Sequence, residues 1–181
     1  GNLREGIIEL VDLKNFKVLH TWNPDIDEFN KSINKINHFK YIDRDNNNSR
    51  RLLTHPKITK DGGLVFNSSA LRKINACSKL IFQNDTDHFH HSIETDIEGN
   101  IWVPSRLTQL SLPIQKVGSY IGKESYKDDA IVKLSPDGEI LYEKSVSHIF
   151  IDNNLEYLLF AVGDFGFTKD PIHLNDIQPV D

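Results

Sequence analysis

Short runs of β-branched and aromatic residues, separated by glycine, aspartate, asparagine and proline, recur along this 181-residue chain. Two such runs around a tight turn are typical of a β-hairpin. The sequence therefore predicts an all-β fold with antiparallel strands. Five hairpins are expected, over residues 6–22, 56–66, 71–82, 92–103 and 130–142.

The hairpins follow one another in a repeating order, which indicates a repeated structural unit. The hairpins at 56–66 and 71–82 are adjacent, and those at 92–103 and 130–142 repeat the order with an insertion between them. Two hairpins give four antiparallel strands, the unit of a β-propeller blade. We expect a single partial propeller domain over residues 1–181, with the outer hairpin of one blade at 6–22, a second blade at 50–84, a third at 88–147 and the start of the next at 170–181.

The connections between the hairpins are predicted to be loops or short helices. Residues 25–37 place Ile26, Phe29, Ile33 and Ile36 at helical spacing, so a short helix is expected there. Residues 173–180 are expected to form the innermost strand of the next blade.

Two complete blades and two partial ones cannot close a ring, because propellers use four to eight blades. Two explanations remain open: the chain is part of a longer protein, or copies of it assemble as a homo-oligomer. The first is favoured, because a blade at the end of an open array would leave strand edges and apolar faces in water. The absence of methionine and the glycine at position 1 also lead us to expect that a start region is missing.

Composition narrows the classes of function. With 38% hydrophobic and 26% charged residues, the chain resembles an ordinary globular domain. The formal net charge of -5 argues against nucleic-acid binding, and no apolar run is long enough to span a bilayer. Cys77 is the single cysteine, so no disulfide can form within the chain.

Histidine recurs at one place in the repeat. His55 precedes Gly62 by seven residues and His91 precedes Gly99 by eight, while His173 lies in the last segment. A residue that recurs in each unit of a repeat can direct several side chains at one central site. Asn175 follows His173 at the i, i+2 spacing, which on a strand places both side chains on the same face.

Three stretches of the chain carry a resemblance to a known family. They are His90-His91-Ser92 with residues 98–103, residues 130–141, and the segment at 170–177 that contains Asp-Pro-Ile-His-Leu-Asn. These stretches are similar to those of bacterial arylsulfotransferases, and the similarity covers roughly residues 50–180. The resemblance implies a six-bladed propeller, of which this chain would supply about half, with the active site in the central channel.

The resemblance also implies a reaction and its site. Members transfer a sulfuryl group from a phenolic sulfate donor to a phenol acceptor through a sulfated histidine, with no nucleotide donor or other cofactor, in the periplasm or as secreted proteins. Catalytic roles are carried over to His91, His173 and Asn175. In the family an arginine and the nucleophilic histidine come later in the chain, beyond the point where this sequence stops. Ser92 also stands where the family usually has an acid.

Two further residues are candidates for substrate binding. His90 belongs to the same cluster as His91, and Arg106 follows the inner hairpin of its blade, where it would lie at the channel mouth. The alternatives are a histidine packed between blades and a solvated loop arginine. On a strand His90 and His91 point in opposite directions, so the choice between them depends on where the strand begins.

The chemistry of these residues suits sulfuryl transfer. The sulfuryl group is tetrahedral and carries charge on its oxygens, so imidazole and amide donors can stabilise it, and a neutral imidazole can accept it covalently. A metal site built from His88, His90 and His91 is a rival hypothesis, but the spacing is not a strong metal signature and no metal is expected. The second hypothesis for function is a non-catalytic propeller module that binds an anionic small ligand or a protein partner.

Overall fold

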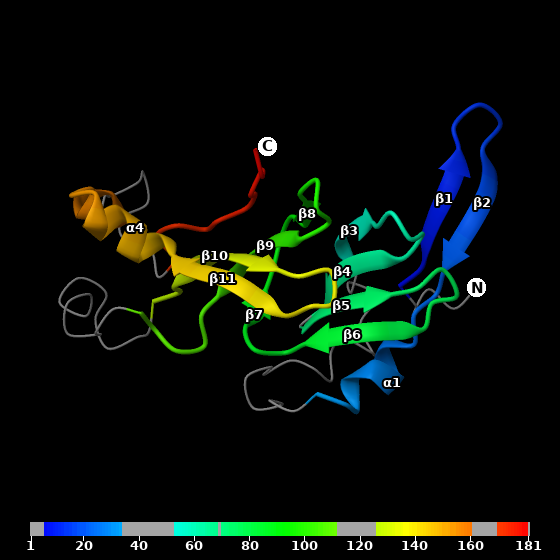
Figure 1. The fold of residues 1–181 in the computed structure, drawn as a ribbon, viewed down its shortest axis with the longest axis horizontal. Coiled ribbons are helices and arrows are strands. Elements are labelled where there is room, and N and C mark those ends of the chain that lie inside the picture. The colour runs from blue at the N-terminus through cyan, green and yellow to red at the C-terminus, as the bar shows by residue number, and fades with distance from the viewer. Residues whose placement is uncertain (1–5, 34–52, 69, 112–125, 161–169, 181) are drawn as a thin grey trace. The chain divides into compact units, whose positions relative to one another are not determined.

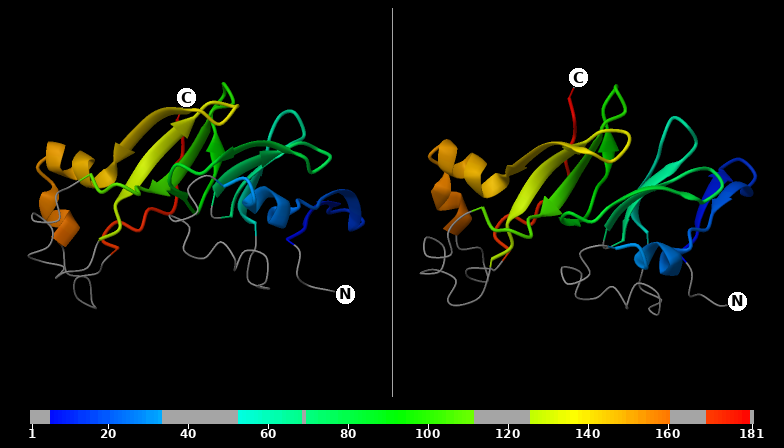
Figure 2. Two further views of the ribbon diagram at one scale, coloured as in Figure 1. Left: turned by 90° about the horizontal axis from the view of Figure 1, so that it is seen from below. Right: turned by 60° about the horizontal axis from the view of Figure 1, so that its bottom comes forward.

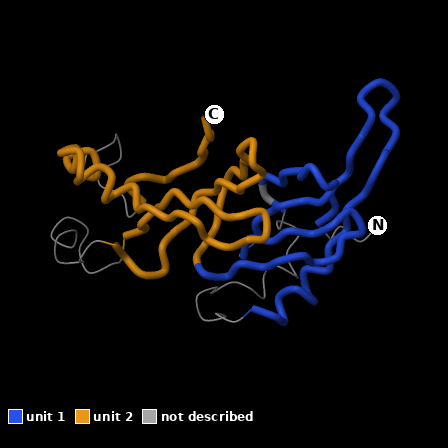
Figure 3. Tube along the Cα trace, in the orientation of Figure 1, with its two compact units in different colours: residues 1–86 blue, residues 87–181 orange. Residues whose placement is uncertain are grey.

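The computed structural model describes residues 6–33, 53–68, 70–111, 126–160 and 170–180. It shows an all-β protein whose strands pair antiparallel, with few helices (Figure 1). The chain divides into two compact units, Gly1–Thr86 and Asp87–Asp181 (Figure 3). No helix among the described residues is both long and apolar enough to cross a membrane.

The first unit contains a hairpin, a helix and a four-stranded sheet. The hairpin consists of β1 (Ile8–Asp12) and β2 (Lys17–Trp22), and the helix α1 covers Ile26–Asn30. The sheet is made of β3 (Thr54–Ile58), β4 (Leu64–Ser68), β5 (Ala70–Ile74) and β6 (Leu80–Asn84), which pair in chain order. Turns at residues 59–63 and 75–79 join β3 to β4 and β5 to β6, and the strands lie in chain order, so the sheet is a simple meander.

The core of this unit lies between the sheet, the hairpin and α1. Trp22 of β2 and Phe29 of α1 pack in one cluster with Leu64 and Phe66 of β4 and with Ile74 of β5. Both central strands are buried along their whole length. The apolar surface removed from water is what makes the five-residue helix stable, because so short a helix does not persist alone.

A buried arginine ties α1 to the sheet. The Arg72 guanidinium on β5 donates to Asn30 Oδ1 at 2.6 Å, to Gln83 Oε1 at 2.7 Å and to the Ser68 carbonyl at 2.8 Å. Burial lowers the pKa of Arg72 to about 10. Because its donors are satisfied by neutral acceptors, this residue is part of the architecture of the first unit.

The second unit repeats the four-strand order. It contains β9 (Ile101–Arg106), β10 (Asp129–Leu134) and β11 (Ile140–Ser145), paired in chain order. Two short strands, β7 (His88–Phe89) and β8 (Glu94–Thr95), both pair with β9. Together they occupy the place that β3 occupies in the first sheet, interrupted by four residues that include His91.

Two helical segments follow this sheet. The helix α4 (Val146–Asp152) starts directly after β11, at the end of the sheet away from the β10–β11 turn, as both views in Figure 2 show. Its N-cap is Ser145, which accepts from the His148 backbone N–H. A 3-10 helix, η2 (Glu156–Phe160), comes next. Its Leu159 packs on Tyr126, and Ile172 of the last segment joins the same cluster.

The turns confirm the repeat at the level of hydrogen bonds. Thr59 N–H donates to the Gly63 carbonyl at 3.0 Å, and Asp96 N–H donates to the Asn100 carbonyl at 3.1 Å. Gly62 and Gly99 occupy the same place in these turns with φ of 77° and 87°. Glycine suits that place because a positive φ costs it little.

A lysine on the third strand of each sheet reaches back to its turn. Lys73 lies 2.9 Å from the Asp61 carboxylate, and Lys133 lies 3.1 Å from that of Asp96. Lys133 also lies over the Trp102 ring, whose indole N–H donates to Asp96. The two sheets thus repeat an ion pair as well as a strand order.

All five predicted hairpins are present. The helix expected over 25–37 is confirmed as α1, while residues 34–37 lie outside the described residues. The strand expected over 173–180 is wrong: these residues form no strand. His173 has φ of 46°, which breaks an extended run, and the segment is held by isolated hydrogen bonds instead of a ladder.

Candidate active site

Three histidines share an unusual backbone conformation. His55, His91 and His173 have φ of 46°, 58° and 46° respectively. A positive φ is uncommon for a residue other than glycine and is held in place only by its surroundings. The histidines that recur in the sequence therefore also share a left-handed backbone conformation, and they occur in both units.

In the second unit, three imidazole rings form a row. The centroid of the His91 ring lies 4.9 Å from that of His90 and 5.3 Å from that of His173. His90 and His91 follow β7, whereas His173 comes from the last segment of the chain. The His90 side chain is 14% exposed and that of His173 is 53% exposed, so the row runs from the interior towards solvent.

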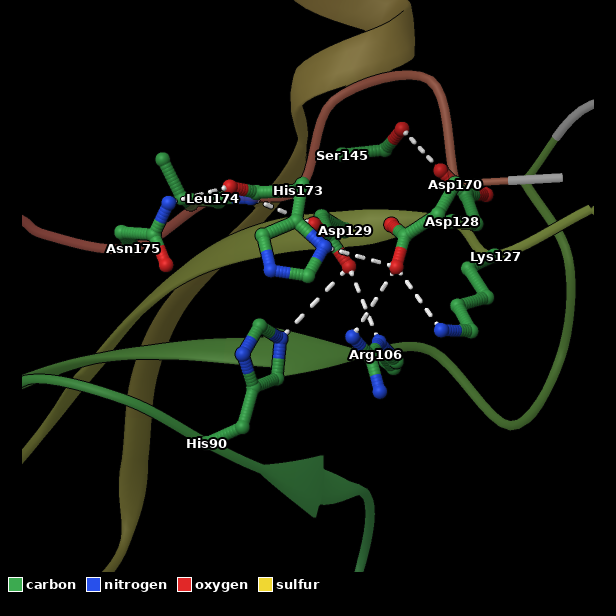
Figure 4. A network of polar contacts seen from close by, with 10 residues as sticks. All are labelled: His90, Arg106, Lys127, Asp128, Asp129, Ser145, Asp170, His173, Leu174 and Asn175. Atoms are coloured by element: carbon green, nitrogen blue, oxygen red, sulfur yellow. Dashed lines mark hydrogen bonds and ion pairs between the residues drawn. The ribbon is translucent and has the colours of Figure 1, made fainter. Parts of the chain in front are cut away.

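A fully buried carboxylate lies at the inner end of this row. Asp129, the first residue of β10, has an Oδ1 that lies 3.5 Å from His90 Nε2 and 3.5 Å from Arg106 Nε (Figure 4). Its Oδ2 accepts from the backbone N–H of Leu174 at 2.7 Å. Asp129 therefore connects two strands of the sheet to the residue that follows His173.

A second carboxylate lies at the outer end. Asp170 Oδ2 lies 2.9 Å from His173 Nδ1, 2.7 Å from Lys127 Nζ and 3.2 Å from Arg106 Nη2 (Figure 4). Burial alone would raise the pKa of Asp170, but the hydrogen bonds from Lys127 and His173 and the charge of Arg106 outweigh it and leave that pKa below its ordinary value. Asp170 is thus ionised at neutral pH.

Several buried polar atoms of this cluster make no hydrogen bond to any described residue. They are both ring nitrogens of His90, Arg106 Nε, Asp129 Oδ1 and Asp170 Oδ1. Native proteins pair nearly all buried polar groups, and exceptions mark catalytic sites or strained positions. The neighbouring Asp128 shows the contrast, because its carboxylate accepts from Ser111 N–H and Ser145 Oγ–H at 2.7 and 2.8 Å.

The structure brings four of the five sequence-predicted site residues into one cluster: the rings of His90, His91 and His173 lie in a row, and Arg106 joins them through Asp129 and Asp170. His90 contacts the buried carboxylate, and Arg106 bridges the two carboxylates of Asp129 and Asp170. Its guanidinium therefore already has anionic partners.

Asn175 has a different environment. Its Nδ2 donates to the backbone carbonyl of His173 at 3.0 Å, and its own carbonyl accepts from Ser92 N–H at 3.2 Å. The Ser92 hydroxyl in turn accepts from Ile177 N–H at 3.4 Å. Asn175 and Ser92 thus support the bend at His173 and fasten the last segment to the sheet.

Sequence reasoning missed three charged residues of the cluster, namely Asp129, Asp170 and Lys127. Two signals were available. Asp129 stands in an acidic pair at the start of an apolar strand, which is an unusual place for carboxylates. Asp170 precedes His173 by three residues, within the stretch that carries the family resemblance.

This arrangement can bind and move protons. A row of imidazoles that ends on carboxylates can hold the rings in a fixed tautomer and stabilise a positive charge on them. Among the described residues, no group of three or more His, Cys, Asp or Glu side chains could hold a metal ion, so the rival metal hypothesis gains no support.

In a comparison with protein-family models, the model described as Arylsulfotransferase (ASST) matches residues 55–181. The matched region contains the whole second sheet, all the residues of the cluster and most of the sheet of the first unit. No curated protein and no solved structure matches the chain.

Proposed function

The chain belongs to the arylsulfotransferase family, and on this premise we propose that the protein transfers a sulfuryl group from a phenolic sulfate ester to a phenol through a sulfated histidine. The observation that carries the proposal is the row of His90, His91 and His173 between two carboxylates. The family match covers every residue of this row.

The reaction divides into two displacements. First an imidazole nitrogen bonds to sulfur while the bond from sulfur to the aryl oxygen breaks, and the departing phenolate takes up a proton. Then the acceptor phenol oxygen bonds to sulfur, the nitrogen–sulfur bond breaks and the phenol proton passes to a base. Both steps resemble phosphoryl transfer, in which positioning and stabilisation of charge supply most of the catalysis.

We assign roles to the cluster on this basis. His91, between the other two rings, donates to a sulfuryl oxygen, and His173, the more exposed ring, carries the phenol proton. His90 and Arg106 bind substrate oxygens at the buried side of the site, where the Asp129 carboxylate balances the charge of Arg106. Asn175 keeps the His173 bend in shape through its hydrogen bond to the backbone.

We further propose that the two sheets are neighbouring blades of a β-propeller. The repeated strand order, the equivalent turns and the equivalent lysine–aspartate pairs support this, because a propeller is built by repetition of such a unit. The family resemblance also leads us to place the protein in the periplasm or outside the cell.

The test is turnover of 4-nitrophenyl sulfate with phenol as acceptor by the full-length protein, because the family resemblance leads us to expect the nucleophilic histidine later in the chain. Released 4-nitrophenol is followed by absorbance, and the concentrations of donor and acceptor are varied together. Parallel double-reciprocal lines are expected, because a covalent intermediate separates the two displacements. His173→Gln should lower the rate about a hundredfold, as loss of a general acid or base does. His20→Gln, which changes a histidine of β2 that bonds the Ala76 carbonyl, is the control and should leave the rate unchanged.

Absence of turnover by the folded protein would overturn the proposal. Retained binding of 4-nitrophenyl sulfate, measured by calorimetry, would then identify a module that binds anionic ligands. Absence of both turnover and binding would leave the histidines with a packing role only.

A further inference from the structure

The His173 imidazole is held on one side by a carboxylate. The Asp170 side chain is 15% exposed and accepts on Oδ2 at 2.9 Å from His173 Nδ1, while the histidine itself is 53% exposed. We propose that Asp170 is a positioning residue that keeps the His173 proton on Nδ1, so that Nε2 carries the lone pair that receives the phenol proton. The proton transfer in this inference rests on the proposed function, whereas the tautomer of the His173 ring rests on the geometry alone.

The tautomer follows from the nature of the acceptor. An ionised carboxylate has no proton to donate, so a hydrogen bond at Nδ1 requires the proton to be on that nitrogen. The second ring nitrogen of the neutral imidazole is then an acceptor. In the absence of such a partner, an imidazole in water favours the opposite tautomer, with the proton on Nε2. Asp170 therefore selects the form that can act as a base at Nε2.

Asp170 is itself fixed by two cations. Lys127 Nζ lies 2.7 Å and Arg106 Nη2 lies 3.2 Å from the same Oδ2 that contacts His173. Their charges keep the carboxylate ionised and restrict its rotation. A carboxylate whose rotation is restricted in this way keeps the imidazole ring in one orientation.

Arg106 extends the arrangement to the backbone beside His173. Its Nε lies 3.5 Å from Asp129, whose other oxygen accepts from Leu174 N–H at 2.7 Å. The side chain of His173 and the peptide that follows it are thus held by two carboxylates that share one guanidinium (Figure 4). Such restraint explains how His173 keeps φ of 46°, a conformation that costs energy in a histidine.

The arrangement has a direct consequence for the second displacement. As the acceptor oxygen bonds to sulfur and the nitrogen–sulfur bond breaks, the phenol proton moves to His173 Nε2. The ring becomes an imidazolium, and Asp170 stabilises its charge without taking the proton from Nδ1. In the first displacement of the next cycle this imidazolium gives its Nε2 proton to the departing phenolate, so His173 alternates between the imidazolium and the neutral Nδ1–H form once in each cycle.

The test measures the tautomer and the rate in the same variants. Protein with ¹⁵N-labelled histidine gives separate signals for protonated and unprotonated ring nitrogens, and the His173 signals are those lost in His173→Gln. With the ring observed in its neutral form at alkaline pH, we expect Nδ1–H in the wild type and a shift towards Nε2–H in Asp170→Ala, which removes the acceptor. The matched control is Asp176→Ala, which removes an exposed carboxylate of the same segment that bonds Gln178.

The kinetic expectation is a change in kcat more than in KM. Carboxylates that orient metal-bound histidines contribute about 10- to 100-fold, and we expect Asp170→Ala to lower kcat by a similar factor with KM within threefold. Asp176→Ala should change neither value. A circular dichroism melt of each variant shows whether it is folded.

Two results would overturn the inference: an Nε2–H tautomer in the wild type, or an unchanged His173 tautomer in folded Asp170→Ala. The wild-type spectrum decides the first point even if the variant does not fold. Absence of turnover in the wild type would overturn the proposed function instead. The spectrum would still report on the positioning of His173 by Asp170, so the two failures are distinguishable.

Discussion

Replacement of the buried carboxylate at the centre of the cluster should reveal how much of the second unit depends on it. Asp129 is fully buried, and Asp129→Ala removes the acceptor for Leu174 N–H and the counter-charge beside Arg106. Loss of one partner from a buried ion pair costs about 3–5 kcal/mol, and an unpaired buried donor costs about 1–3 kcal/mol. Because the Arg106 side chain is 28% exposed and can turn to water, we expect about 3 kcal/mol in total.

The same reasoning gives a smaller effect for an isosteric change. Asp129→Asn keeps an oxygen that can accept from Leu174 N–H, so it removes the charge alone and should cost about 1.5 kcal/mol. Arg106→Met, alone and combined with Asp129→Ala, completes a double-mutant cycle. The coupling energy should be about 1–2 kcal/mol, because the alanine variant has already lost the partner that the arginine serves.

The two tryptophans allow each unit to be followed separately. Trp22 lies in the first unit and Trp102 in the second, and the chain has no other tryptophan. In a Trp22→Phe background, urea unfolding followed by fluorescence reports on Trp102 and hence on the unit that contains Asp129. A free energy of unfolding for Asp129→Ala within about 0.5 kcal/mol of the parent would refute the reasoning, and so would a coupling energy of zero.

Three further predictions concern the architecture. Asp96→Asn should cost about 2 kcal/mol at neutral pH in urea unfolding. Burial would raise the pKa of Asp96, but hydrogen bonds from Asn100, Trp102 and Lys133 hold it far below its ordinary value of 3.8. The stability that ionised Asp96 contributes is therefore present above pH 3.8 and is lost as the pH falls through the lower pKa of the folded state. The free energies of unfolding of the wild type and of Asp96→Asn should converge in acid, and a difference that stays constant with pH would contradict this. Gly63→Ala should cost about 2 kcal/mol, since its Cβ would lie 2.5 Å from the Ile74 carbonyl oxygen; an unchanged melting temperature would argue against it. Arg72→Met should destabilise the first unit by about 3 kcal/mol, because several buried acceptors lose their donor; a loss seen equally in both tryptophan signals would contradict its assignment to that unit.

The hairpins were predictable because their signals are local. A glycine at positive φ between two runs of β-branched residues defines a turn without knowledge of the rest of the chain, as Gly62 and Gly99 show. The break between β7 and β8 was not predictable, since it depends on a left-handed residue at His91 that the sequence pattern does not demand. The strand expected over 173–180 failed for a related reason: alternation of side chains requires a ladder partner, which this segment does not have among the described residues.

The gathering of histidines in this cluster was predictable, whereas the carboxylates beside them were not. His91 and His173 stood out by their recurrence and by the family resemblance. Asp129 owes its importance to burial beside Arg106, and Asp170 owes its importance to the bend that returns its side chain to His173. Contacts of this kind arise from tertiary packing, so residue type and spacing alone give a weak indication of them.

The central claim is that His91 and His173 act in the same sulfuryl transfer, His91 on a sulfuryl oxygen and His173 on the phenol proton. The most direct measurement is kcat/KM for 4-nitrophenyl sulfate in His91→Gln, His173→Gln and the variant that carries both changes. Each single change should lower kcat/KM about a hundredfold, and the double variant should be within a few-fold of the worse single one, because residues that act as a unit give non-additive losses. Losses that multiply in the double variant, or a single variant that is folded and retains wild-type kcat/KM, would contradict the account.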